Sequence, residues 1–206
     1  MVIGWMLIPI AVTTAWLVPL VPRYTSSRAI SMWMMWLFAS AVTAAVLVFS
    51  ADHQDADVWS WLGFGAAVVP LGALLVIDIL THRLPRQISL VAAVPVVALL
   101  LIGGGPSGRW AVVIAAIVNW LVSVLLRILT RGSLGLGDVM IAPLLGAIVG
   151  WFSPWALAAL WLVASVLGAV WSVLSVTSGR RSRRDQIAYG PFLIMGTLAA
   201  VLGSAF

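Results

Sequence analysis

Two of the aspartates in this sequence stand apart, because three others share the short loop at residues 52–57 and Asp185 lies among arginines. The chain has 206 residues and only six acidic ones, all of them aspartate. Asp78 lies at the end of one apolar run, and Asp138 lies at the start of a later one. An ionisable side chain in or beside a membrane segment is costly, so its default interpretation is functional. These two residues are therefore the candidates for chemistry.

Two carboxyl groups that share a site can perform acid–base chemistry on water. They do not both ionise readily, so one proton is held between them. The ionised member deprotonates a water molecule, and the protonated member donates to a carbonyl oxygen or a leaving amine. The helix dipole favours negative charge at a helix N-terminus, so Asp138 is expected to be the ionised member and Asp78 the proton holder.

Each aspartate also has a structural alternative. Asp138 could cap a helix, because aspartate accepts backbone N–H bonds at a helix start. Asp78 could form an interfacial ion pair with Arg83 or Arg86. His82 lies beside these arginines and is expected to be a solvated loop residue.

The apolar runs predict the elements that position these residues. The chain is 63% hydrophobic and 8% charged, whereas a soluble domain carries about 25% charged residues. A membrane helix needs about 20 apolar residues, so we expect an all-α polytopic bundle of about eight transmembrane helices, forming a single domain over residues 1–206. The predicted helices cover roughly 2–22, 29–50, 58–80, 88–104, 110–129, 138–152, 155–177 and 187–206.

The arginines predict how these helices are oriented. All 11 basic residues are arginine, and the alternation of loops puts ten on one side of the membrane and Arg109 alone on the other. The positive-inside rule assigns the ten to the cytoplasm and the N-terminus to the outside. Asp78 and Asp138 then share one depth, at the cytoplasmic side, and the acidic loop at residues 52–57 lies outside.

Six tryptophans are predicted to lie at the outer ends of the helices, where they would form an interfacial aromatic belt. They are Trp5, Trp59, Trp61, Trp110, Trp151 and Trp155.

Composition argues against several other classes of function. The chain has no cysteine, which excludes disulfides, a thiol nucleophile and a cysteine-based zinc site. Its net charge of +5 is explained by membrane topology. No arginine belongs to the aromatic-interleaved patch expected of a nucleic-acid interface, so no nucleic-acid partner is expected.

Glycines precede the second aspartate in the sequence Gly135-Leu136-Gly137-Asp138. Glycine allows backbone conformations and close approaches that a side chain would block, which suits a loop that admits an extended peptide. A flexible turn between helices is the structural alternative.

Three segments together resemble the type IV prepilin peptidases. Residues 78–85 (Asp-Ile-Leu-Thr-His-Arg-Leu-Pro) resemble the family's first-aspartate segment. Residues 132–139 (Gly-Ser-Leu-Gly-Leu-Gly-Asp-Val), followed by Gly146 and Gly150, resemble its second-aspartate segment. Residues 187–193 (Ile-Ala-Tyr-Gly-Pro-Phe-Leu) look like its C-terminal Phe-Gly-Pro-Phe-Leu signature. The resemblance is strongest from about residue 70 to residue 206.

The resemblance implies a membrane-embedded aspartic endopeptidase of the Gly-x-Gly-Asp type. Such an enzyme removes the basic leader of prepilin-like proteins at the cytoplasmic face of the inner (plasma) membrane. It implies catalytic roles for Asp78 and Asp138, a supporting role for Gly135 and Gly137, and no metal or other cofactor. The implied partners are the lipid bilayer and a prepilin-like substrate with a basic leader and an apolar helix. Without cysteines, the chain resembles the short, peptidase-only members of the family.

Two residues depart from the family pattern, and two rival functions remain open. Met140 stands where the family usually has lysine, and Arg86 stands where asparagine is common; both positions bear on substrate contacts. Presenilin-like proteases share Gly-Leu-Gly-Asp, but Ile77 precedes Asp78 here and no Pro-Ala-Leu occurs. A non-catalytic or transport-type membrane protein could use the same aspartates. Transport would favour polar residues at mid-membrane, of which Asn119 is the clearest.

Overall fold

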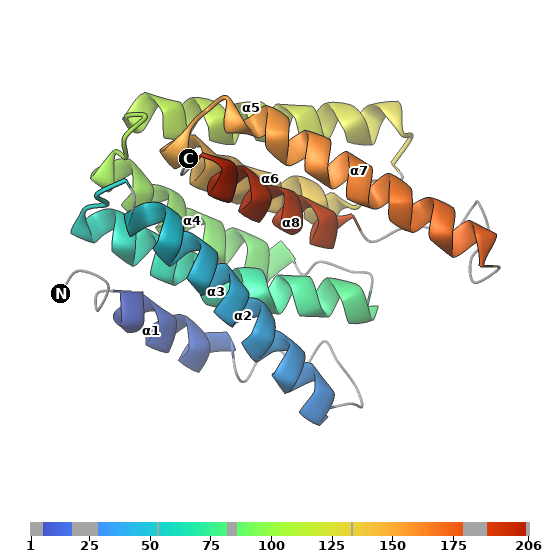
Figure 1. Cartoon of the computed structure of the whole chain (residues 1–206), viewed down its shortest axis with the longest axis horizontal. Coiled ribbons are helices and arrows are strands. Elements are labelled where there is room, and N and C mark those ends of the chain that lie inside the picture. The colour runs from blue at the N-terminus through green and yellow to red at the C-terminus, as the bar shows by residue number, and fades with distance from the viewer. Residues whose placement is uncertain are drawn as a thin grey trace.

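Each of the predicted apolar runs contains one α-helix. The computed structural model describes residues 6–17, 29–52, 54–81, 86–132, 134–178 and 189–204. Across these residues the chain forms eight helices, which confirms the all-α class (Figure 1). They are α1 (Leu7–Leu17), α2 (Ala29–Asp52), α3 (Val58–Thr81), α4 (Arg86–Gly103), α5 (Arg109–Leu129), α6 (Leu136–Phe152), α7 (Ala156–Thr177) and α8 (Gly190–Gly203).

Four of these helices are long and apolar enough to cross a membrane, so the chain is a multi-pass membrane protein. The four stretches are Met35–Asp52, Val58–Ile79, Arg109–Leu129 and Ala156–Ser175. Helices α1, α4, α6 and α8 are apolar but shorter. With 17 residues, α6 is about 25 Å long, somewhat less than the bilayer core of about 30 Å.

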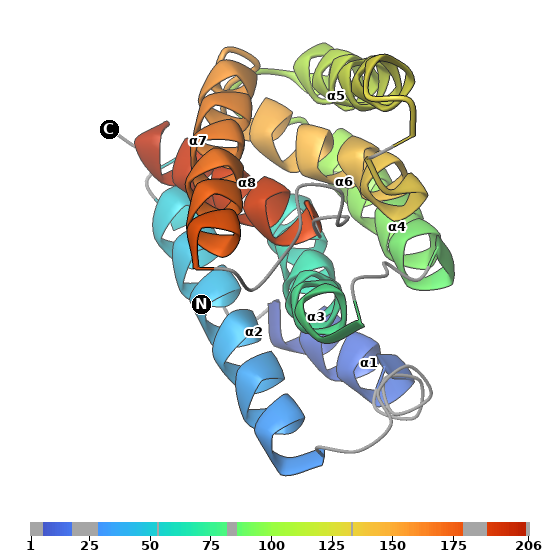
Figure 2. The same ribbon diagram turned by 90° about the vertical axis from the view of Figure 1, so that its right-hand side faces the viewer.

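Helices α3 and α6 occupy the interior of the bundle. Helix α3 packs against α1, α2, α4 and α8, and α6 packs against α4, α5, α7 and α8 (Figure 2). Most residues of α3 are buried, whereas most residues in the apolar stretches of α2, α5 and α7 are not. In α6, 13 of 17 residues are buried. The two candidate aspartates therefore lie on the two interior helices.

Helix α3 begins at the end of the bundle where α6 finishes. The indole N–H of Trp151, near the end of α6, donates to Ser60 Oγ, near the start of α3, at 2.8 Å. The connection between α4 and α5 reaches the same end, where Ser107 Oγ donates to the Phe152 carbonyl at 2.6 Å. In Figure 1 the connection between α4 and α5 lies on the left. The end of α3 and the start of α6 therefore meet at the opposite end of the bundle.

Apart from the buried Asp78 and Asp138, the charged residues of the described part of the chain differ between these two ends. The acidic connection between α2 and α3 lies at the first end, together with Arg109 at the start of α5. Arg127 and Arg131 lie at the second end, where α5 finishes. This separation agrees with the alternation of loops predicted from the sequence. The other predicted cytoplasmic arginines lie outside the described residues, except for Arg86, of which only the backbone is described: Arg23, Arg28, Arg83, Arg180, Arg181, Arg183 and Arg184.

The predicted tryptophan belt is only partly correct. Three of its members are exposed, as a membrane interface requires: Trp59, Trp110 and Trp155. Trp61 and Trp151 are instead buried, so the prediction was wrong for them. Two residues along a helix correspond to a rotation of about 200°, which turns Trp61 inward while Trp59 faces outward. Trp5 lies outside the described residues.

Candidate active site

Asp138 lies in the first turn of α6, and its side chain folds back over the start of the helix. Gly135 is the N-cap residue, and its backbone N–H donates to Asp138 Oδ2 at 3.1 Å. A full capping box would need a second bond from an N-cap side chain, which glycine lacks. The cap that was the structural alternative for Asp138 is thus present, but it uses only Oδ2. The carboxyl group is also buried, with 4% of the residue exposed.

Glycine at position 135 lets the carboxylate lie close to the N-cap residue. A Cβ atom added to Gly135 would lie 2.9 Å from Asp138 Oδ2. A side chain there would therefore require the carboxylate to shift. The second motif glycine, Gly137, is the second residue of α6 and is half-buried.

Asp78 lies in the last turn of α3 and is also buried. Only 3% of the residue is exposed, and its neighbour Ile77 is completely buried. A helix C-terminus disfavours an anion, so the helix itself offers this carboxylate no stabilisation. The ion pair predicted as its alternative falls on Arg83 and Arg86, whose side chains lie outside the described residues.

The two aspartates approach each other at this end of the bundle. The Asp138 carboxylate interacts electrostatically with Asp78, which repels it, and with Arg127, which attracts it. Two buried like charges are costly, and holding one proton between them removes the repulsion. The structure therefore brings the two carboxyl groups close enough to interact, and their roles as acid and base stay a prediction.

Arg127 also belongs to the site, although its position in the sequence predicted only on which side of the membrane it lies. It lies in the last turn of α5. Its Nη1 donates to the carbonyl oxygen of Leu134, in the turn that leads into α6. The available signal was an arginine at a predicted helix end, 11 residues before the motif aspartate.

Asn119 is buried at the junction of α5, α6 and α7. Its Nδ2 donates to the Ala142 carbonyl of α6 at 2.8 Å. Its Oδ1 accepts from the indole N–H of Trp161 in α7 at 2.9 Å. The polar side chain that could have indicated transport thus has two protein partners and joins three helices.

Two glycines allow α6 to approach α5 closely. A Cβ added to Gly146 would lie 2.7 Å from Asn119 Cβ, and one added to Gly150 would lie 2.8 Å from the Ala111 carbonyl oxygen. Small residues spaced four apart commonly mediate such close helix contacts in membranes. These glycines therefore hold α6, which carries Asp138, tightly against α5.

The C-terminal signature forms the start of α8. Tyr189 is the N-cap residue, and Pro191 lies in the first turn, where its missing N–H costs no helical bond. The ring of Tyr189 covers Gly168 of α7, where an added Cβ would lie 3.1 Å from Tyr189 Cε2. This part of the signature thus packs α8 on α7, while its first two residues, 187 and 188, lie outside the described residues.

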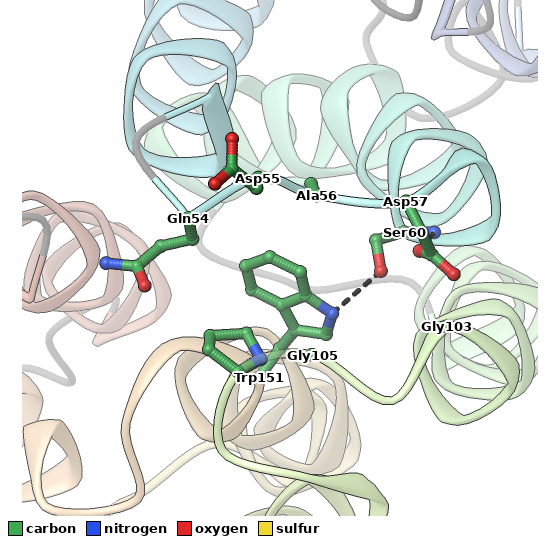
Figure 3. Close-up of a pocket in the computed structure, with 9 residues that line it drawn as sticks. Gln54, Asp55, Ala56, Asp57, Ser60, Gly103, Gly105 and Trp151 are labelled. Atoms are coloured by element: carbon green, nitrogen blue, oxygen red, sulfur yellow. Dashed lines mark hydrogen bonds between the residues drawn. The ribbon is translucent and has the colours of Figure 1, made fainter.

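A pocket of about 260 Å³ lies at the other end of the bundle (Figure 3). It is lined by Gln54, Asp55, Ala56, Asp57, Ser60, Gly103, Gly105, Pro106 and Trp151. Ser60 and Asp78 are both on α3, 18 residues apart, which corresponds to about 27 Å along the helix. The pocket is therefore separate from the pair of aspartates.

The fold and the site define an all-helical membrane protein with two buried aspartates at one end of its interior helices. A comparison with protein-family models matches residues 65–173 to the type IV leader peptidase family. The match covers just over half of the chain and includes both aspartates, and the chain belongs to this family. The family consists of aspartic-type prepilin peptidases, which confirms the resemblance found in the sequence. The comparisons with curated proteins and with solved structures gave no match.

Proposed function

We propose that this protein cleaves the basic leader from prepilin-like proteins at the cytoplasmic face of the membrane, with Asp78 and Asp138 as its catalytic pair. The observation that carries the proposal is the position of the two residues. Each is buried on an interior helix, and the two lie near each other at one end of the bundle. Membership of the leader peptidase family supports the same reaction.

In the proposed reaction, Asp138 is the base and Asp78 is the acid. Burial and the neighbouring Asp78 oppose a charged Asp138, whereas the Gly135 N–H bond and the attraction of Arg127 favour it. We assign the base to Asp138 because of these two stabilising contacts and its place at a helix N-terminus. Asp138 takes a proton from water, the hydroxide attacks the scissile carbonyl carbon, and Asp78 protonates the carbonyl oxygen. When the tetrahedral intermediate collapses, Asp138 passes its proton to the leaving amine and the C–N bond breaks. A hydroxyl group of the intermediate gives its proton to Asp78 as the product carboxyl group forms, which restores the starting pair.

Both carboxyl groups are buried, so this end of the bundle must open to admit the peptide. The substrate's apolar helix would remain in the bilayer while its basic leader reaches the cytoplasmic end. Residues 1–206 would act as a single domain with eight spans and the N-terminus outside, in the plasma membrane. The separation of charge between the two ends of the bundle supports this orientation.

Cleavage by single carboxamide variants tests the proposal. Purified protein in lipid nanodiscs is incubated with a tagged prepilin-like protein that has a short basic leader, a glycine at the cleavage point and one apolar helix. Asp78→Asn and Asp138→Asn should each lower kcat by roughly 10³-fold or more, and the double variant should be little worse, because the pair acts as a unit. Mass spectrometry of the shortened product measures the rate.

The matched control is Asp55→Asn, at the opposite end of the bundle. Asp55 is exposed, and its backbone has a φ of 50°, which asparagine tolerates well. This variant should cleave at the wild-type rate. Asparagine at position 138 can still accept the Gly135 N–H bond, so loss of activity there should not reflect unfolding. Wild-type cleavage by both single variants at normal expression would refute the catalytic assignment.

A further inference from the structure

Arg127 and Asp138 bind opposite ends of the same peptide group. Arg127 Nη1 donates to the carbonyl oxygen of Leu134. The N–H of the next residue, Gly135, donates to Asp138 Oδ2 at 3.1 Å. The carbonyl and the N–H belong to one planar unit, the Leu134–Gly135 peptide, in which they point in opposite directions. The unit therefore lies between a cation at its oxygen and a carboxylate at its nitrogen.

This arrangement lets the guanidinium act on the carboxylate without covering it. Hydrogen bonds in series polarise one another, so a cation at the carbonyl makes the N–H a stronger donor. A bond with a charged partner is also shorter and stronger than a neutral one. Asp138 uses Oδ2 for this bond, so Oδ1 takes no part in it. The same two bonds fix the turn that carries the carboxylate.

The local backbone shows why the turn needs such a constraint. Arg131 and Gly132 both have left-handed conformations, with φ of 53° and 86°. The chain thus reverses sharply between α5 and α6, and Leu134 is buried immediately after the reversal. The Arg127 side chain, which is half-buried, reaches across from the last turn of α5 to hold the far side of this reversal.

We infer that Arg127 is a positioning residue that orients Asp138, and favours its charged form, through the Leu134–Gly135 peptide. This inference rests on the proposed catalytic role of Asp138. A purely structural alternative also exists, because a cation in the last turn of α5 interacts favourably with the helix dipole. That alternative needs only a positive charge at the helix end, whereas the positioning role needs the bond to Leu134 as well.

Substitutions at position 127 separate the two roles. Arg127→Gln removes the charge, and Arg127→Lys keeps the charge but lacks the planar group that matches the carbonyl. We expect Arg127→Gln to lower kcat by roughly 10- to 100-fold and Arg127→Lys by a smaller factor, with KM unchanged, because a slightly misplaced catalytic group costs rate rather than binding. The matched control is Arg131→Gln, an exposed arginine four residues further on, which should keep the wild-type kcat.

Hydrogen exchange provides a readout that does not depend on activity. Peptides covering residues 134–138 should exchange faster in Arg127→Gln than in wild-type protein or in Arg131→Gln. If Arg127→Gln does not accumulate as folded protein, a reduced kcat and faster exchange in Arg127→Lys carry the same conclusion.

The outcomes distinguish this inference from the proposed function. Failure of the wild-type protein to cleave, or full activity of Asp138→Asn, would refute the proposed function. The exchange measurement would then decide the inference about the turn, and unchanged exchange in Arg127→Gln would refute it. An active wild-type enzyme together with wild-type kcat in Arg127→Gln would overturn the inference while leaving the proposed function intact. A KM that rises with kcat unchanged would also overturn it, because that pattern indicates substrate contact.

Discussion

Gly135 leaves the space into which the Asp138 carboxylate folds. The added Cβ of Gly135→Ala would lie 2.9 Å from Oδ2, so the carboxylate must shift from its position, which weakens its backbone bond. Even complete loss of one such bond to a charged group would lower the free energy of unfolding by only about 1.5–3 kcal/mol, whereas misplacing a catalytic group by about 1 Å can cost 10²-fold in rate. We therefore expect Gly135→Ala to lower kcat by roughly 10- to 100-fold while the protein remains folded, as measured by prepilin cleavage and thermal unfolding.

The control for this substitution is Gly203→Ala, near the end of α8, where an added Cβ would have no described atom within 4 Å. It should leave both the rate and the stability unchanged. Because Arg127 and Gly135 act on the same bond to Asp138, the effects of Gly135→Ala and Arg127→Gln should combine less than additively. A Gly135→Ala enzyme with wild-type kcat would mean that the cap has no catalytic importance.

The sequence predicted some residues of this site and not others, for a physical reason. Asp78 and Asp138 were predictable because a charged group beside an apolar run is costly wherever the chain folds. Arg127 was not, because its role depends on a turn that brings the carbonyl of Leu134 within reach of its side chain. Nothing about an arginine at a helix end specifies which carbonyl it will meet.

A polar junction and two close glycine contacts hold helix α6 against α5. Asn119 of α5 donates to the Ala142 carbonyl of α6 and accepts from Trp161 of α7. A double-mutant cycle with Asn119→Ala and Trp161→Phe isolates the second bond. We expect a coupling free energy of about 0.6 kcal/mol, the average for hydrogen bonds between membrane helices, and no more than about 1.7 kcal/mol. Reversible unfolding in detergent measures it.

Trp171→Phe is the control on the same helix, since Trp171 is half exposed on the outer surface of α7. The effects of Trp171→Phe and Asn119→Ala on the free energy of unfolding should be additive within about 0.3–0.5 kcal/mol. A coupling free energy near zero for Asn119 and Trp161 would contradict the bond seen in the structure.

At the scale of helices, apolar runs were sufficient to predict the elements but not their arrangement. Every run contains a helix, because a long apolar stretch in a membrane must satisfy its backbone internally. The interior positions of α3 and α6 were not predictable, because a helix that is apolar all round can face either lipid or protein. Trp61 shows the same limit, since a tryptophan near a helix end suits both a membrane interface and a packed core.

The bundle as a whole has two chemically different ends, and this difference supports an orientation in the membrane. The acidic connection between α2 and α3 lies at one end, and Arg127 and Arg131 lie at the other with the two candidate catalytic residues. An excess of arginine marks the cytoplasmic side. Since a basic leader stays in the cytoplasm for the same reason, the proposed site and its substrate would meet on one side.

Cysteine labelling in intact cells and in inverted membrane vesicles tests this orientation directly. The chain has no native cysteine, so each single-cysteine variant reports one position to a membrane-impermeant maleimide. Asp55→Cys should react in intact cells. Thr130→Cys, which follows α5, and His82→Cys, which follows α3 in the sequence, should react only in inverted vesicles. Reaction of positions 82 and 130 on opposite sides of the membrane would refute the aspartate pair, because Asp78 and Asp138 could not then share a site. Reaction of both from outside would preserve the pair but reverse the orientation, and would be incompatible with cleavage at the cytoplasmic face.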